Sequence, residues 1–127
     1  MPVTALLTGI FALMMVSLSV PVSLRRRALA VAYGDGGDRW LGRLIRAHGN
    51  FAEYAPLLLI VLAMVEIADA PKPFVWTLAA AFLLCRVLHA LGALFLRSNP
   101  LTRAAGMLLM HGGLLAGGLY LLVYWRP

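Results

Sequence analysis

Charged residues are scarce in this sequence, and acidic residues are scarcer still. Only 13% of the 127 residues are Asp, Glu, Lys or Arg, about half the share in a soluble domain. By contrast, 62% are hydrophobic, and the mean hydropathy is +0.88. This composition excludes an ordinary soluble domain and predicts a single-domain integral membrane protein that spans a lipid bilayer.

The shortage of acidic residues and of cysteine limits the partners and cross-links that the chain can have. Five acids stand against eleven Lys and Arg, for a net charge of +6. Because basic loops set the orientation of membrane proteins, this excess calls for no nucleic-acid partner, and none is expected. Cys85 is the single cysteine, which excludes an intrachain disulfide. It lies in an apolar run, where we expect a buried thiol rather than a nucleophile.

Long apolar segments dominate the rest of the chain. They predict helices over about residues 3–24, 39–68, 74–96 and 101–125, each long enough to cross roughly 30 Å of hydrocarbon. The first segment lacks the basic start and the cleavage site of a signal peptide, so we expect it to be retained. Arg25–Arg27 are expected to end it, and Asp38 is the predicted N-cap of the second helix. Short connections predict an all-α, up-down-up-down four-helix bundle over residues 1–127.

Arginine placement predicts the orientation of the bundle. Arg25, Arg26, Arg27, Arg39 and Arg43 lie between the first two spans, and Arg97 lies between the last two. The other connection has only Lys72. The positive-inside rule therefore predicts that both termini are on the non-cytoplasmic side.

Polar residues interrupt the apolar pattern mainly near the predicted cytoplasmic end. Arg46, Asn50 and Glu53 are spaced i, i+4 and i+7, so they share one helix face; Tyr54 lies beside it and His48 points elsewhere. An ionisable residue inside a membrane span costs roughly 2.5–3.5 kcal/mol on insertion scales. A snorkelling collar explains Arg46 but not the two deeper residues. This stretch is therefore a candidate functional site.

The other spans bring further polar residues to the same level. Arg86 and His89 lie in the third, Arg103 in the first turns of the fourth, and Arg26 at the end of the first. This convergence predicts a positively charged pocket with one acid, Glu53. Such a pocket suits a small anionic ligand with an amine, because arginines bind carboxylates through paired hydrogen bonds.

The stretch from Arg46 to Pro56 reads Arg-Ala-His-x-Asn-x-x-Glu-x-x-Pro. It resembles the MAPEG family, the membrane-associated proteins of eicosanoid and glutathione metabolism. The resemblance implies a homotrimer that binds glutathione, as co-substrate, between subunits and transfers it to a lipophilic substrate. The implied glutathione contacts are Arg26, Arg46, His48, Asn50, Glu53, Tyr54, Arg86 and His89. The resemblance also implies that Arg103 is the catalytic residue, which stabilises the thiolate without a metal ion.

Several positions depart from the family pattern. Ala93 replaces a tyrosine of several eukaryotic members, and Ala104 and Met107 replace a serine and a tyrosine of prostaglandin E synthase. Gly49 stands where some members have a second arginine. These departures argue against eicosanoid synthesis and leave thiolate formation resting mainly on Arg103.

Two other functions remain open from the residues alone. Glu53 suits a small proton-coupled oligomeric transporter, and the departures suit a noncatalytic scaffold of the same family. Glu53 paired with Arg86 or Arg46 would instead be a structural ion pair.

Other polar and small residues have packing or surface interpretations. His48, His89 and His111 lie on separate predicted helices, so no metal site is expected. His111 is expected to pack across helices, and Glu66 and Asp69 to be solvated. The Gly113-x-x-x-Gly117 spacing predicts close helix packing.

Overall fold

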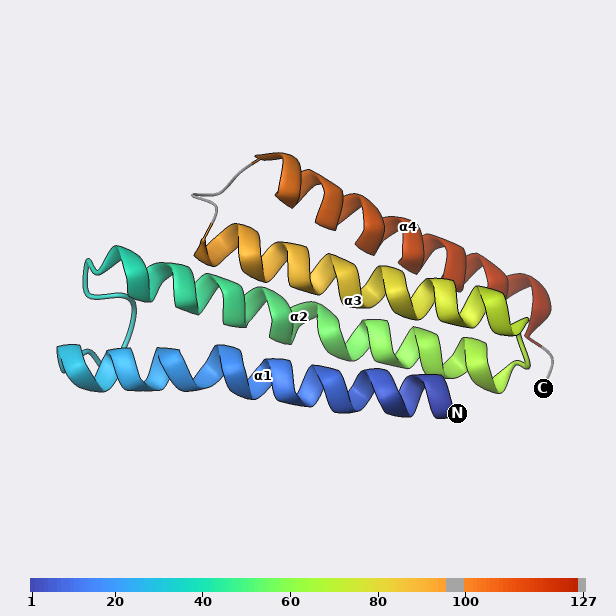
Figure 1. The fold of residues 1–127 in the computed structure, drawn as a ribbon, viewed down its shortest axis with the longest axis horizontal. Helices are drawn as coiled ribbons and strands as arrows, with labels where there is room; N and C mark the ends of the chain where they lie inside the picture. The colour runs from blue at the N-terminus through green and yellow to red at the C-terminus, as the bar shows by residue number, and fades with distance from the viewer. Residues whose placement is uncertain (96–99, 126–127) are drawn as a thin grey trace.

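The computed structural model describes residues 1–95 and 100–125, except for the side chains of residues 100 and 103. Within these ranges the chain forms helices and no strands, which confirms the predicted all-α class. The helices are α1 (Pro2–Leu29), α2 (Arg39–Ile67), α3 (Lys72–Leu94) and α4 (Pro100–Tyr124). All four of these described helices are long and apolar enough to cross a membrane. The α1–α2 loop lies at one end, and the N-terminus and the α2–α3 loop lie at the other (Figure 1).

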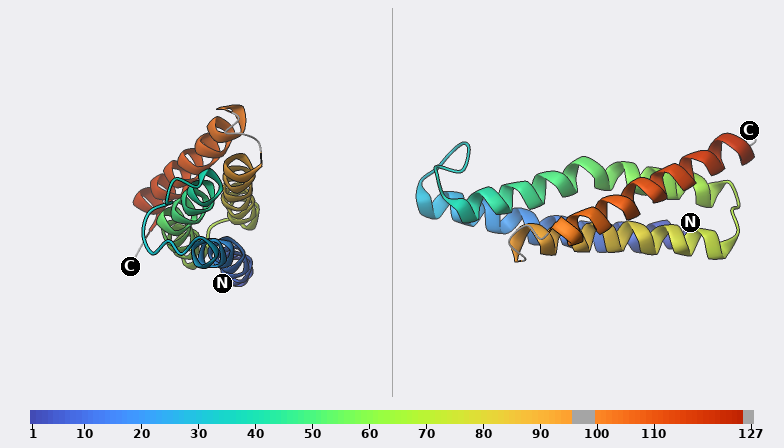
Figure 2. Two further views of the ribbon diagram at one scale, coloured as in Figure 1. Left: turned by 90° about the vertical axis from the view of Figure 1, so that its left-hand side faces the viewer. Right: turned by 90° about the horizontal axis from the view of Figure 1, so that it is seen from above.

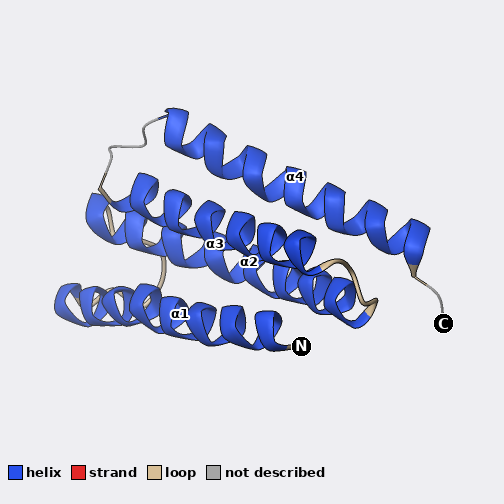
Figure 3. Cartoon of the chain, turned by 45° about the vertical axis from the view of Figure 1, so that its right-hand side comes forward, coloured by secondary structure: helices blue, strands red, loops and turns tan. Residues whose placement is uncertain are grey.

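Helices α2 and α3 share the centre of the packing. Each contacts the other three helices, whereas α1 and α4 make no contact among the described residues. Accordingly, α2 and α3 lie between α1 and α4, which crosses them at an angle (Figures 2 and 3). Leu58, Leu62 and Val65 of α2 and Phe82 of α3 are fully buried. Most of the candidate site thus lies on the two helices that each contact all the others.

Helix α1 extends further than the sequence predicts. We expected Arg25–Arg27 to end it near residue 24, but it continues to Leu29 with Arg26 and Arg27 in its last turn. Cationic side chains at a helix C-terminus interact favourably with the exposed carbonyl groups, so these arginines end the apolar span and not the helix. Ala30, at a φ of 54°, caps it through its backbone N–H, as a left-handed residue does at many helix ends.

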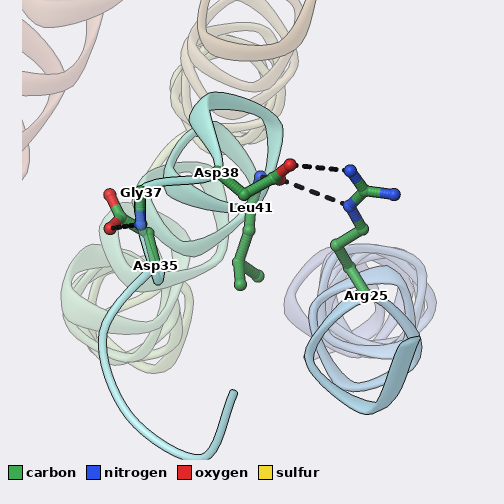
Figure 4. A network of polar contacts seen from close by, with 5 residues as sticks. All are labelled: Arg25, Asp35, Gly37, Asp38 and Leu41. Atoms are coloured by element: carbon green, nitrogen blue, oxygen red, sulfur yellow. Dashed lines mark hydrogen bonds and ion pairs between the residues drawn. The ribbon is translucent and has the colours of Figure 1, made fainter. Parts of the chain in front are cut away.

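The start of α2 confirms Asp38 as its N-cap. The Asp38 carboxylate accepts a hydrogen bond from the Leu41 backbone N–H at 2.6 Å and pairs with Arg25 Nη2 at 2.6 Å (Figure 4). The hydrogen bond from Arg25, together with that from Leu41, lowers the pKa of the Asp38 carboxyl below its ordinary value. One carboxylate therefore ties the end of α1 to the beginning of α2.

Glu66 joins the same two helices at their other ends. We expected it to be solvated, but its carboxylate accepts hydrogen bonds from the backbone N–H groups of Val3 and Thr4 at 3.0 and 2.9 Å. It also accepts one from the Thr4 hydroxyl at 2.7 Å. The first N–H groups of a helix have no partner inside it, and Met1 supplies no side-chain cap. Glu66 of α2 satisfies them, and its negative charge suits the N-terminal end of α1.

Replacing Glu66 by alanine should therefore lower the stability of the whole bundle. The change removes three hydrogen bonds to a charged group and leaves two backbone N–H groups of α1 without an acceptor. We expect a loss of roughly 1–3 kcal/mol, measured as thermal unfolding in detergent. Asp69→Asn, which removes an exposed charge nearby, is the matched control. Equal melting of Glu66→Ala and wild type would contradict the capping role.

Candidate functional site

The most buried charge of the described residues belongs to Arg86 of α3, whose side chain is 3% exposed. Its Nη1 donates to Asn50 Oδ1 at 2.8 Å and to the Asn50 carbonyl at 3.3 Å. Its Nη2 lies 3.0 Å from Met110 Sδ, and its Nε 3.4 Å from Cys85 Sγ. The guanidinium carbon lies 5.3 Å from the centre of the Tyr54 ring. We call these five residues the Arg86 cluster.

The Arg86 cluster joins α2, α3 and α4 through one guanidinium. Its partners are an amide, two sulfur atoms and an aromatic ring, and the ring stabilises the cation through its negative face. None of them carries a compensating charge. Among the described residues the ion pair Arg25–Asp38 is the one found, so the structural pairing of Arg86 with Glu53 does not occur within one chain. Arg86 is therefore a buried positive charge with no compensating acid among the described residues.

A second feature is an open cavity of about 470 Å³ at the end that carries the α1–α2 loop. We call it the arginine cavity. Residues from α2, α3 and the α1–α2 loop line it: Asp35, Arg39, Gly42, Arg43, Arg46, His89 and Ala93. It brings together two predicted site residues, Arg46 and His89. Ala93 forms part of the wall with a methyl group, at the position where some family members have a phenol.

Glu53 belongs to neither the Arg86 cluster nor the arginine cavity. Its side chain is exposed on α2 and makes no hydrogen bond or ion pair with any residue that the structure describes. Arg46, on the same helix face, is likewise exposed and unpaired, and His48 is half-buried. An acid that faces outward from a membrane span needs a polar partner. One chain alone does not supply that partner within the described residues.

One predicted site residue, Arg26, lies apart from these features, and another, Arg103, has no described side chain. Arg26 donates from Nη1 to the Ala32 carbonyl at 3.0 Å, so in this chain it holds the α1–α2 loop. Arg103 belongs to α4, but its side chain lies outside the described part of the structure.

Sequence reasoning missed the charged residues Asp35, Arg39 and Arg43 of the arginine cavity, and Cys85 and Met110 of the Arg86 cluster. Arg39 and Arg43 are spaced i and i+4 and lead to Arg46 at i+7, so their helical spacing was the available signal. Asp35 enters the cavity through the fold of the loop, which spacing does not specify. Cys85 was correctly predicted to be buried, but its contact with Arg86, and that of Met110, required the packing of α3 against α4.

Comparison with known proteins gives a consistent result. Residues 4–123 match the MAPEG family. The chain is 34% identical over 90 residues to the inner membrane protein YecN of Escherichia coli K12, an alignment covering 71% of this chain and 69% of YecN. YecN of Escherichia coli O6:H1 matches to the same extent. No solved structure matches. With its apolar helices and an inner-membrane relative, this chain is a multi-pass membrane protein, and it belongs to the MAPEG family.

Proposed function

We propose that this protein binds glutathione and transfers it to lipophilic electrophiles, or uses it to reduce lipophilic hydroperoxides. One observation carries the proposal. The motif on α2 is joined to Arg86 through Asn50, while Arg46 and Glu53 keep opposite charges with no partner among the described residues. Glutathione has two carboxylates, one amine and one thiol, and these groups complement such a site.

Each charged group of glutathione is assigned to residues of opposite charge. Arg46 and Arg86 bind carboxylates, because a guanidinium matches the two oxygens of a carboxylate. Glu53 takes the ammonium group, and Asn50 and Tyr54 offer further hydrogen bonds. His48 and His89 complete the proposed contacts on α2 and α3. No metal ion enters this scheme.

The chemistry depends on the thiolate of glutathione. A free thiol has a pKa of about 8.5, and its thiolate is the nucleophile. Arg103, at the start of α4, is the proposed stabiliser of that thiolate, and the thiol proton goes to water. The sulfur then forms a bond to an electrophilic carbon, and the leaving group departs with the bonding electrons. With a hydroperoxide, the sulfur bonds to the terminal oxygen as the O–O bond breaks, which releases the alcohol and leaves a sulfenic acid. A second glutathione then attacks that sulfur, forms the disulfide and releases water.

We further propose that the working unit is a homotrimer of up-down-up-down bundles, with both termini on the non-cytoplasmic side and glutathione between neighbouring subunits. Arg26 would then approach the ligand bound mainly by the adjacent subunit. The outward position of Glu53 supports this assembly. His111 supports it as well: we expected it to pack across helices, and in one chain it is exposed in the middle of α4. A second subunit would give both side chains polar surroundings.

Glutathione calorimetry on the detergent-purified oligomer tests the site. Arg46→Ala and Glu53→Ala should each weaken binding by roughly 30-fold or more, as expected when one partner of a buried charge pair is removed. Arg27→Ala, an exposed arginine in the last turn of α1, is the control and should bind normally. Full binding by both site variants, in intact oligomers, would refute the assignment.

A noncatalytic role in the same family is the second candidate, and Ala93 favours it. A methyl group lines the cavity at the place of a phenol, which removes one hydrogen-bond donor from the thiol region. A generic chlorinated aromatic substrate separates the two functions. Turnover supports the transferase, and glutathione binding without turnover supports the scaffold. If glutathione does not bind, loss of proton-coupled efflux in Glu53→Gln would support a transporter instead.

A further inference from the structure

The proposed glutathione site leaves two arginines of the arginine cavity without a role. Arg39 and Arg43 lie in the first turns of α2 and line the cavity together with Arg46. All three are exposed, and none makes a hydrogen bond or ion pair with a described residue. Their guanidinium groups are therefore available to a ligand.

The position of Arg39 and Arg43 is unfavourable for α2 itself. The N-terminal end of a helix carries a partial positive charge and is stabilised by acids, not by cations. The first turn of α2 contains no acid, and the cavity adds two arginines to that end. Asp38 caps this end of α2 but is also paired with Arg25, so an anion in the cavity would offset the charge of the two arginine side chains.

The acids of the loop do not neutralise this charge. Asp38 is engaged by Arg25 and faces away from Asp35 (Figure 4). Asp35 lines the cavity, but its Oδ1 accepts the Gly37 backbone N–H at 3.0 Å. Three guanidinium groups therefore face one carboxylate, and the cavity suits a ligand with a compact negative charge.

The arginine cavity lies at the end of the bundle where we expect the membrane surface. It lies at the α1–α2 loop end, where α2 begins, and Trp40, the residue after Arg39, is 39% exposed. Tryptophan is enriched where the bilayer meets water. A lipid headgroup can reach this level while its acyl chains remain in the bilayer.

We propose that the arginine cavity binds the phosphate group of an anionic phospholipid, with Arg39 and Arg43 as its principal ligands. Guanidinium groups donate paired hydrogen bonds to phosphate oxygens, and basic pockets between membrane helices bind lipid headgroups. The positive-inside rule alone also places arginines here. It requires no cavity, however, and it makes no distinction between these arginines and Arg27.

Native mass spectrometry of the detergent-purified oligomer tests the proposal, with phosphatidylglycerol or phosphatidylcholine added. Wild type should retain phosphatidylglycerol about tenfold more strongly than phosphatidylcholine. The Arg39→Ala/Arg43→Ala variant should lose this preference, and each single variant should lose part of it. Arg27→Ala, which removes an arginine outside the cavity, should keep it.

Several outcomes would overturn the proposal. One is an unchanged preference in the double variant, or in both single variants if the double variant does not fold. Another is an equal loss in Arg27→Ala, which would indicate general surface charge. A third is displacement of the lipid by equimolar glycerol phosphate, which would indicate a site for soluble phosphate esters.

Glutathione calorimetry on the same variants separates this inference from the proposed function. Arg39→Ala/Arg43→Ala should still bind glutathione, and Glu53→Ala should still prefer phosphatidylglycerol. Each proposal can therefore fail while the other stands.

Discussion

Arg86→Ala is expected to lower the free energy of unfolding by roughly 3 kcal/mol or more, a larger loss than Glu66→Ala should cause. The substitution removes two hydrogen bonds to Asn50 and the stacking on Tyr54. It also leaves a cavity where the guanidinium contacted Met110. Because these contacts join three helices, the loss should affect the whole bundle and not one element.

Thermal unfolding in detergent measures this effect. Arg39→Ala is the control, because it removes the same side chain from an exposed position with no partner among the described residues. Asn50→Ala should lose part of the same stability, and the double variant should lose less than the sum, since the two residues share their hydrogen bonds. Additive losses would mean that the Asn50–Arg86 contact contributes little.

Arg86→Met separates the structural role of this residue from its proposed role in binding. Methionine keeps much of the volume and removes the buried charge, and such replacements of buried ionic groups are often neutral or stabilising. We expect this variant to melt closer to wild type than Arg86→Ala does and yet to lose glutathione. A stable variant that still binds glutathione would assign Arg86 to packing alone.

The sequence was sufficient for features that depend on local pattern. Apolar length predicted the four helices, and Asp38, followed by an amphipathic turn, predicted the start of α2. The motif from Arg46 to Pro56 led to the family. The end of α1 was misjudged because charges end an apolar run without breaking helical hydrogen bonds.

Contacts between distant parts of the chain could not be predicted in the same way. Glu66 caps Val3 and Thr4 across more than 60 residues, and this depends on α1 and α2 ending at the same level. Helical spacing defined the faces of α2 and α3 but not their mutual rotation. That rotation decides that Arg86 meets Asn50 and not Glu53.

Gly113→Leu is expected to weaken the packing of α4 against the rest of the bundle. The spacing of Gly113 and Gly117 predicted close packing, and the structure confirms it. A Cβ at Gly113 would lie 2.6 Å from the Phe82 ring, and one at Gly117 would lie 2.5 Å from Val61 Cγ1. The Phe82 ring is fully buried, so it has little room to move. Overpacking of a well-packed core typically costs about 1–3 kcal/mol, and a leucine at this position should reach the upper end.

The neighbouring glycines supply a matched control on the same helix. A Cβ at Gly112 or Gly118 would meet nothing within 4 Å, so Gly112→Leu and Gly118→Leu change helix propensity and hydrophobicity without steric conflict inside the chain. The melting temperatures of the four variants should therefore fall into two pairs, with those of Gly113→Leu and Gly117→Leu the lower. If the Gly112 and Gly118 variants instead lose the oligomer while the chain stays folded, that face of α4 contacts another subunit. Equal stability of all four would mean that α4 does not pack on Phe82 and Val61 in the membrane.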